Sequence, residues 1–314
     1  MRSAVITGCT GEIGNALVRL LLAQGWEVHA VCRPNSRRSR FLLQADRLRI
    51  LECDLFDLAS AAQALPEKCG VFFHLGWHAS YGAERLDPYG QARNILAALD
   101  AVNLAAKLGC SVFVGAGSQA QYGDTEETLT PETSMRPSTA YGAAKLCAEQ
   151  MTRELCATKG IRHVWGRVVS VYGPCDGPHT LITYLMRTQL RGEEAILTPC
   201  GQYWDFLYAE DTARAFLSMA ESGKDGQPYC VASGSCRPLH EYMHDFQHVL
   251  GGKAKLHIGG KSYTPNQRMR LCADISTLRA DTGFAPLVPF LEGIERTWQW
   301  YAQHPEALTS WEAE

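Results

Sequence analysis

Three side chains near the middle of the chain have the types and spacing needed to move a proton to or from a substrate oxygen. Tyr141 and Lys145 stand four residues apart, which places them on one face of a helix. A nearby ammonium stabilises a phenolate, so we expect Lys145 to lower the pKa of Tyr141, as a general acid or base working near neutral pH requires. Ser118 ends an apolar run and can hydrogen-bond the same substrate oxygen. These residues predict a catalytic site.

A glycine-rich turn near the start of the chain has the pattern of a phosphate-binding loop. Residues 7–14 read Thr-Gly-Cys-Thr-Gly-Glu-Ile-Gly, between a short apolar run and a helical pattern. Glycines there allow a tight turn, close approach of a diphosphate and close packing of helix on sheet. The helix N-terminus adds N–H donors and the positive end of its dipole. We therefore expect a dinucleotide at Gly8, Gly11, Glu12, Ile13 and Gly14.

The end of the second predicted strand indicates which dinucleotide binds. An NAD site places a carboxylate there, ~20 residues after the glycines, to accept the ribose 2′-hydroxyl. This chain has Cys32 and Arg33 instead, followed by Arg37, Arg38 and Arg40. A carboxylate would repel a 2′-phosphate, whereas guanidinium groups bind it. We predict NADP(H) with Arg33 as a contact and keep NAD(H) as the alternative; a solvated loop is the second interpretation of the later arginines.

Short apolar runs alternate with longer helical patterns through the first half of the chain. This alternation is typical of βαβ units and predicts a Rossmann-type, doubly wound parallel α/β sheet. We expect strands at residues 4–7, 28–31, 48–51, 71–74, 112–114, 163–171 and 229–232. Helices are expected from Ile13, over 94–107 and over 141–157.

The pattern loosens after Gly173 and Pro174, where prolines and glycines frame an insertion with one helix over 181–191. From Pro238 onward the composition is mixed α/β. We therefore predict a dinucleotide-binding domain over residues 1–172 and 203–234. A smaller C-terminal α/β substrate-binding lobe is predicted over residues 173–202 and 235–314.

Composition excludes several classes of protein. Of the 314 residues, 46% are hydrophobic and 20% are charged, which supplies a core and argues against a disordered chain. The net charge is -3 without a long run of one sign, so neither nucleic acid nor a membrane surface is expected as a partner. The first residues do not resemble a signal peptide, and no stretch reaches the ~18 apolar residues of a membrane span. We expect a cytoplasmic protein with a small-molecule ligand.

The twelve cysteines are scattered as single residues inside apolar runs, and no two have CxxC spacing. Neither a zinc site nor a thioredoxin-like motif is therefore predicted, and no metal is expected. We expect the cysteines to be free thiols in a reducing compartment.

In their order and spacing these motifs resemble the extended short-chain dehydrogenase/reductase family, in particular its NAD(P)-dependent epimerase/dehydratase group, which acts on nucleotide sugars. The resemblance covers nearly the whole chain and includes Asp54-Leu55, His74-Leu75-Gly76, Tyr122-Gly123, Val171-Tyr172-Gly173-Pro174 and Asp205-Phe206-Leu207-Tyr208. It implies that Asp54 and Leu55 flank the adenine and that Gly76 lies along the diphosphate and ribose. A helix cap at Asp54 and a turn at Gly76 are the second interpretations.

The resemblance also assigns roles at the reaction centre and a partner. Tyr141 would be the acid or base, Ser118 its partner, and Lys145 would also bond the nicotinamide ribose. A homodimer is implied, in which the helices beginning near Asn94 and Tyr141 form a four-helix bundle with a second copy.

Departures from relatives of this group narrow the reaction. Sugar-nucleotide 4,6-dehydratases carry an Asp-Glu pair directly after the catalytic hydroxyl, where this chain has Gln119 and Ala120. Neither can exchange a proton, so we set dehydration aside. Relatives similar to GDP-fucose synthase have a cysteine at the place of Ala120. His179 is a candidate acid near the substrate, with a surface or capping histidine as the alternative interpretation.

A further departure concerns the diphosphate of the substrate. Many relatives place an arginine before Asp205, where this chain has Trp204, for which core packing is the favoured interpretation. Arg268 and Arg270 are candidate replacements, because a buried diphosphate needs cationic or N–H partners. Surface charges are the alternative interpretation of both arginines.

We predict NADPH-dependent reduction of the C4 ketone of a nucleoside-diphosphate 4-keto-6-deoxyhexose. The motifs around Ser118 and Asp205 are similar to those of 4-ketoreductases of such sugars. The predicted substrate-binding residues are Ser118, Gln119, Tyr141, His179, Arg268 and Arg270. The alternatives are a nucleotide-sugar 4-epimerase that retains NAD and a carbonyl reductase of a non-nucleotide ketone. A sensor that binds NADP without turnover ranks last, because the Tyr/Lys pair is intact.

Overall fold

A seven-stranded parallel sheet forms the centre of the chain in its computed structural model, which describes residues 2–265 and 267–308. The strands lie in the order β11-β6-β5-β4-β1-β2-β3. Strand order reverses between β1 and β4, as in doubly wound dinucleotide-binding folds. The predicted Rossmann-type α/β fold is confirmed. The predicted lobes also include Met1, Asn266 and residues 309–314, which lie outside the described residues.

The seven strands of the sheet lie close to the predicted runs. They are β1 (Ser3–Thr7), β2 (Glu27–Cys32), β3 (Leu48–Glu52), β4 (Val71–His74), β5 (Val112–Ser118), β6 (Arg162–Val168) and β11 (Pro228–Val231). Short 3-10 helices connect several elements: η1 (Arg37–Phe41), η2 (Leu55–Asp57), η3 (Ser60–Gln63), η4 (Ala83–Leu86), η5 (Gln119–Gln121) and η6 (Pro305–Leu308).

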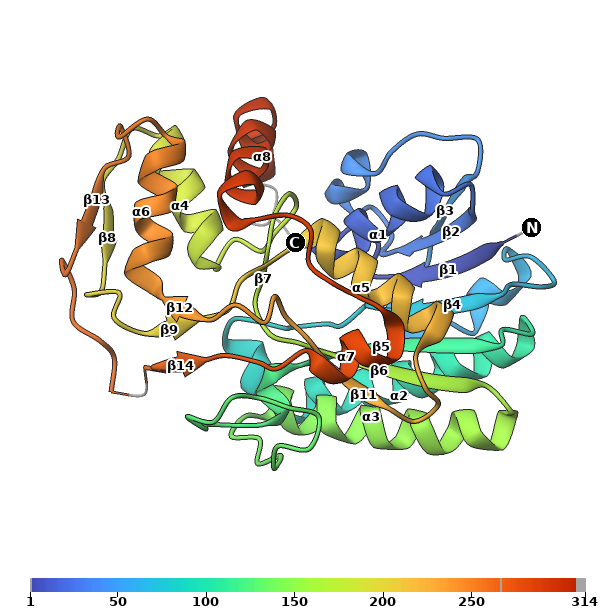
Figure 1. The fold of residues 1–314 in the computed structure, drawn as a ribbon. Helices are drawn as coiled ribbons and strands as arrows, with labels where there is room; N and C mark the ends of the chain where they lie inside the picture. Colours follow the sequence, from blue (N-terminus) through green and yellow to red (C-terminus); the bar gives the residue numbers. More distant parts are fainter. Residues whose placement is uncertain (1, 266, 309–314) are drawn as a thin grey trace.

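Helices cover both faces of the sheet (Figure 1). On one face lie α1 (Glu12–Ala23) and α5 (Ala209–Ser222), and on the other lie α2 (Pro88–Lys107) and α3 (Ala140–Lys159). Successive residues of β1 point to opposite faces: Ile6 packs in the apolar cluster of α1 and α5, and Val5 packs in that of α2 and α3. Burial on both faces explains why β1 and β4 are mostly apolar.

Three boundaries differ from the sequence prediction for local reasons. Helix α2 begins at Pro88 rather than at Asn94, because the Asp87 side chain accepts hydrogen bonds from Tyr89 N and Gly90 N and caps it there. Strand β5 continues to Ser118, and Gly115 and Gly117 along it leave space for the Trp165 ring. The strand predicted over 163–171 ends at 168, and β7 (Val171–Tyr172) pairs with β10 (Leu207–Tyr208) instead.

The remaining elements form a smaller region with its own apolar cluster. It contains α4 (Leu181–Leu190), α6 (Leu239–Val249), α8 (Phe290–Gln303), a pair of strands β8 (Ala195–Leu197) and β13 (Leu256–Ile258), and three strands β12 (Arg237–Pro238), β9 (Tyr203–Trp204) and β14 (Arg270–Leu271). Helix α7 (Ser276–Thr282) instead packs with the central sheet through Leu278. The division into two lobes remains a prediction.

The expectation that the cysteines are free thiols throughout is wrong. Cys236, just before β12, and Cys272, just after β14, form a disulfide with their Cα atoms 5.4 Å apart. β12 and β14 flank the same strand, β9, which brings together two cysteines separated by 36 residues. Sequence spacing carries no signal for a pairing made through a third strand.

None of the described helices combines the length and the apolar character needed to cross a bilayer.

A buried ion pair between α3 and β6 leads to a prediction about stability. Glu149 and Arg167 are 2.6 Å apart with side chains 5% and 2% exposed. We expect Glu149→Ala to lower the free energy of unfolding by about 3–5 kcal/mol in urea denaturation, because it leaves the Arg167 charge buried and unpaired. Glu67→Ala, at an exposed side chain, should cost less than about 1 kcal/mol. Equal losses would contradict the assignment.

Candidate active site

Two adjoining cavities of about 610 and 420 Å³ lie at the carboxyl ends of the strands, around the point where strand order reverses. Gly8, Thr10, Gly76 and Trp77 line both. Ligands of open α/β sheets bind at this edge. We call the larger the adenosine-side cavity and the smaller the catalytic cavity.

The glycine-rich turn forms a close backbone cradle. Gly8 has φ of 72°, and a Cβ on it would lie 2.6 Å from Gly76 N; a Cβ on Gly14 would lie 2.2 Å from Gly8 O. Helix α1 begins directly after the turn without a side-chain cap at Gly11, so its first N–H groups face the cavity without such an acceptor. The predicted residues Gly8, Gly11, Glu12, Ile13 and Gly14 all line the catalytic cavity. This arrangement fits a dinucleotide diphosphate.

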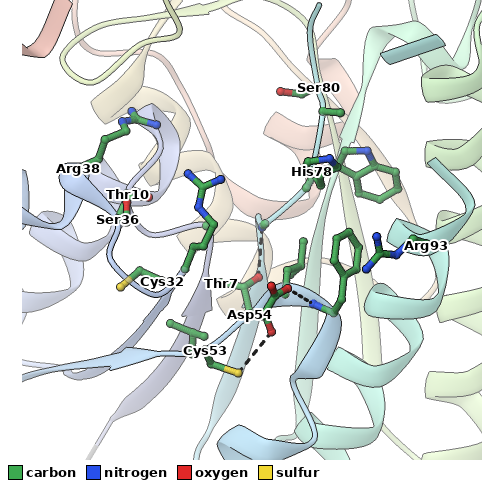
Figure 2. A pocket seen from close by; sticks show the side chains of 18 of the residues that line it. Thr7, Thr10, Cys32, Ser36, Arg38, Cys53, Asp54, His78, Ser80 and Arg93 are labelled. Atoms are coloured by element: carbon green, nitrogen blue, oxygen red, sulfur yellow. Dashed lines mark hydrogen bonds between the residues drawn. The ribbon is translucent and has the colours of Figure 1, made fainter. Parts of the chain in front are cut away.

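The adenosine-side cavity is lined by five residues that the sequence analysis singled out: Cys32, Arg33, Asp54, Leu55 and Gly76. Figure 2 shows Cys32 and Asp54 at the ends of neighbouring strands beneath it. Asp54 also accepts a hydrogen bond from Phe56 N at 2.8 Å, so it caps η2 and lines the cavity at once. The position of Asp54 is therefore compatible with both interpretations, a helix cap and a contact to the adenine.

The arginines after β2 do not share one environment. Arg33, Arg37 and Arg40 are exposed, as a solvated loop requires. Arg38 is buried at 6% exposure, and its Nη2 donates to Cys175 O at 2.5 Å. Arg38 thus ties the loop after β2 to the segment after β7, and the solvated interpretation fails for it.

Ser118, Tyr141 and Lys145 line the same catalytic cavity. Ser118 ends β5, and Tyr141 lies in the first turn of α3, which Thr139 caps by accepting from Gly142 N at 3.1 Å. The Ser118 and Tyr141 side chains lie close enough for the serine hydroxyl to influence the pKa of Tyr141. Strand end and helix start therefore place two hydroxyl groups together at the carboxyl edge of the sheet.

The expected effect of Lys145 on Tyr141 is wrong in this structure. Lys145 Nζ donates to Ala116 O at 2.6 Å and lies 5.9 Å from the centroid of the Tyr141 ring. Burial raises the pKa of Tyr141, against the smaller opposing effects of the Ser118 hydrogen bond and the Arg85 charge. Burial also lowers the pKa of Lys145 to about 7. The burial of Tyr141 therefore outweighs the charges around it.

Two side chains near Tyr141 were not predicted. The Arg85 guanidinium carbon lies 4.5 Å from the centroid of the Tyr141 ring, and Trp77 meets the same ring edge-on at 6.1 Å. Both belong to the segment that follows β4 at the carboxyl edge. That position was the available signal, since loops at this edge line the ligand cleft.

The structure separates the predicted substrate residues. Gln119 lies beside Ser118 in η5, and its Oε1 is buried without a hydrogen-bond partner among the described residues. His179 lines the adenosine-side cavity, is exposed, and packs on Tyr81 with ring centroids 5.2 Å apart. It does not line the catalytic cavity.

Arg268 and Arg270 point to different surroundings. Arg268 Nη2 donates to Gly123 O at 2.5 Å and lies 3.6 Å from Asp124. Arg270 donates to Thr128 Oγ1 at 3.2 Å, and neither arginine lines either of the two cavities. Trp204 packs with its Nε1 donating to Ser170 Oγ at 3.0 Å, as the core interpretation requires.

A pair of buried carboxyl groups joins the two regions beside the glycine turn. Glu12 begins α1, and Asp176 follows β7; the two carboxyl groups lie close enough to influence each other, and both line the catalytic cavity. Burial is the main cause that raises the pKa of Glu12 above its usual range and that of Asp176 to about 6. Asp176 also accepts from Thr180 Oγ1 and Gly177 N, each at 2.5 Å.

Asp176 gives a pH-dependent prediction. Its folded-state pKa of about 6 exceeds the ordinary 3.8, so its contribution to stability is full below pH ~4 and is lost as pH rises through 6. Relative to wild type, Asp176→Asn should therefore gain up to ~3 kcal/mol of unfolding free energy between pH 4 and 7. Urea denaturation at each pH measures this. The exposed control Asp100→Asn should stay flat; an equally flat Asp176→Asn difference would refute the assignment.

Comparison with known proteins agrees with this geometry. The dTDP-glucose 4,6-dehydratase of Escherichia coli is 28% identical over 190 residues, 57% of this chain and 52% of the dehydratase. The chain thus spans about half the length of the curated relatives it matches. The solved UDP-N-acetylglucosamine 4-epimerase of Methanobrevibacter ruminantium M1 has a TM-score of 0.87 at 24% identity, covering 96% of this chain and 99% of that one.

A second solved structure, MoeE5 in complex with UDP-glucuronic acid and NAD, has a TM-score of 0.82 at 25% identity and covers 96% of this chain and 99% of that one. The family model for the NAD dependent epimerase/dehydratase family matches residues 4–232. With the reversed strand order and the glycine cradle, this match establishes that the chain belongs to the NAD dependent epimerase/dehydratase family, a group within the extended short-chain dehydrogenases/reductases.

Proposed function

We propose that this protein is an NADPH-dependent reductase of the C4 ketone of a nucleoside-diphosphate 4-keto-6-deoxyhexose. The observation that carries the proposal is that Ser118, Tyr141 and Lys145 line one cavity together with the glycine turn. A bound reduced nicotinamide supplies the hydride. The protein must then supply one proton to the carbonyl oxygen and hold that oxygen in place.

The burial of Tyr141 suits a proton donor. Because burial raises the pKa of Tyr141, the phenol keeps its proton at neutral pH and can give it to the oxygen of the ketone. Ser118 donates a second hydrogen bond to that oxygen and stabilises its developing negative charge. The Lys145 ammonium adds a positive charge to the same cavity. Reduction of the ketone consumes the proton that the buried Tyr141 phenol holds.

The residues beside Ser118 support reduction over dehydration. Gln119 and Ala120 follow the hydroxyl, and neither side chain exchanges a proton. Elimination of water requires an additional acid and base, which the 4,6-dehydratases resembled by this chain carry at these positions. A nucleotide-sugar 4-epimerase is the second candidate, because similar structures are 4-epimerases and their chemistry needs no such pair. It would retain NAD and return the hydride without net consumption of cofactor.

Two guanidinium groups favour a substrate that carries a diphosphate over a simple ketone. Arg85 Nε and Arg268 Nη1 are buried and have no hydrogen-bond partner among the described residues. Burial lowers the pKa of Arg268, and the charge of Arg85 lowers it further. The two guanidinium groups are therefore close enough to repel each other. Diphosphate oxygens supply the acceptors that such groups lack.

A homodimer through α2 and α3 forms part of the proposal. Leu96 on α2 and Met151 on α3 are 61% and 43% exposed, and a shallow groove lined by Leu99, Met151 and Leu155 runs between these helices. Covering this apolar face with the same face of a second copy would remove it from water. We propose a cytoplasmic location, where thiols stay reduced, because ten of the twelve cysteines are free thiols in the structure.

Arg33 provides a test of the cofactor. It lines the adenosine-side cavity at the end of β2, where a carboxylate would select NAD. We expect Arg33→Ala to weaken NADPH binding ~10–100-fold in calorimetry, the loss of one charge-assisted contact, and to change NADH binding less than ~3-fold. Arg37→Ala, an exposed arginine that lines neither cavity, is the matched control. Equal losses for both cofactors would favour the NAD alternative.

Tyr141 provides a test of the reaction. Purified protein is incubated with NADPH and CDP-, dTDP-, UDP- or GDP-linked 4-keto-6-deoxy sugars, and oxidation of NADPH is followed by absorbance. We expect one donor to be reduced and Tyr141→Phe to lower kcat roughly 10²–10⁴-fold, because the proton donor is lost while the ring remains. NADPH affinity of the variant should stay within ~3-fold of wild type. Absence of oxidation with every donor, together with interconversion of UDP-sugars, would establish the epimerase instead.

A further inference from the structure

Trp77 occupies a central place in the cleft that no motif explains. It follows Gly76 at the end of β4 and lines both the adenosine-side and the catalytic cavity. Lys145 Nζ lies 3.8 Å from the centroid of its ring. The same indole meets the Tyr141 ring edge-on at 6.1 Å. One aromatic side chain therefore contacts both members of the Tyr/Lys pair.

The indole is held by a buried anchor. Trp77 Nε1 donates to Gln91 Oε1 at 2.9 Å, and Gln91, only 1% exposed, donates in turn to Ala79 O at 2.9 Å. The next residue, His78, donates its N–H to Asn94 Oδ1 at 2.8 Å. Two side chains of α2 thus fix the segment after β4, and the ring face toward Lys145 is fixed with it.

The ammonium of Lys145 has little other support. Its one hydrogen bond in the described chain is to Ala116 O, and no carboxylate forms an ion pair with it there. Its titratable and charged neighbours are Tyr141 on α3, His74 on β4 and, across the Tyr141 ring, Arg85 in η4. Burial lowers the pKa of His74 to about 3, so this ring is neutral. None of these groups is an anion at neutral pH.

An aromatic face can hold a cation where a carboxylate is absent. The ring quadrupole attracts an ammonium, and the attraction is strongest for tryptophan and in desolvated sites. Unlike a carboxylate, an indole carries no negative charge that would repel the phosphates expected at the glycine turn. The 3.8 Å separation lies well inside the distance at which this attraction operates.

We propose that Trp77 is a positioning residue whose indole face keeps Lys145 charged and directed into the catalytic cavity beside Tyr141. The proposal rests on the proposed function, because a charged Lys145 matters for proton transfer at Tyr141. In this proposal Trp77 acts together with Ser118, Tyr141 and Lys145, and Gln91 holds the Trp77 indole in place.

The proton affinity of Lys145 tests the proposal without a catalytic assay. The rate at which Lys145 reacts with trace acetic anhydride, followed by peptide mass spectrometry across pH, gives the midpoint of its titration. We expect Trp77→Leu to lower this midpoint by roughly one pH unit, a tenfold loss of proton affinity. Trp77→Phe, which keeps a weaker aromatic face, should lower it less. An unchanged midpoint would overturn the proposal, and so would a rise, because then the indole acts only by excluding water.

Matched variants separate this role from a general loss of structure. Trp26→Phe changes a buried tryptophan that lies under Arg2, far from the cleft, and should leave the Lys145 midpoint unchanged. Gln91→Leu, which releases the indole, should shift the midpoint in the same direction as Trp77→Leu; no shift would contradict the anchoring. The pH profile of kcat for Trp77→Phe should move with the midpoint.

The same data distinguish failure of this inference from failure of the proposed function. A lowered midpoint in Trp77→Leu, with no wild-type oxidation of NADPH on any 4-keto sugar, supports the role of Trp77 and removes the reductase. Oxidation of NADPH by wild type with an unchanged Trp77→Leu midpoint supports the reductase and overturns the role of Trp77.

Discussion

Desolvation of ionisable groups at the carboxyl edge of the sheet is the constraint on which the site depends. Tyr141 and Lys145 lie at 8% and 4% exposure, and burial moves each toward its neutral form, the phenol by raising its pKa and the ammonium by lowering it. Burial therefore favours a protonated tyrosine and disfavours the lysine charge. Neighbours without negative charge, such as Ala116 O and the Trp77 ring, hold that charge in place.

The fold buries these groups by bringing several chain segments to one place. Strand β1 pairs with both β2 and β4, so the segments after β1 and β4 meet, and Gly8 and Gly76 pack too closely for any side chain on Gly8. The contact leaves the N-terminus of α1 facing the cavity. It also brings the residues after β4, including Trp77 and Arg85, against α3. A cofactor cradle and a proton-transfer site thus share one wall because two neighbouring strands end together.

Features with a local cause were predictable from the sequence, and features that depend on distant partners were not. The glycine turn, β4 and the Tyr/Lys spacing follow from residues that are near one another in the chain. The cysteines at 236 and 272 pair through a third strand, and the burial of Arg38 depends on Cys175, 137 residues away. The prediction of a lowered pKa for Tyr141 was wrong for a related reason. The spacing of Tyr141 and Lys145 indicates that a charge is near, but the extent of desolvation depends on all the segments that pack around the phenol.

The contact between the two regions shows how such long-range burial bears on ligand binding. Glu12 and Asp176 lie close together, and burial with the neighbouring Asp176 charge raises the pKa of Glu12. The pair lies beside the turn where a diphosphate fits, so this shift reduces the negative charge that the diphosphate would meet. Arg38, whose charge opposes the rise in the pKa of Glu12, donates to Cys175 O next to Asp176. Charge at the glycine turn is therefore set jointly by α1, the loop after β2 and the segment after β7.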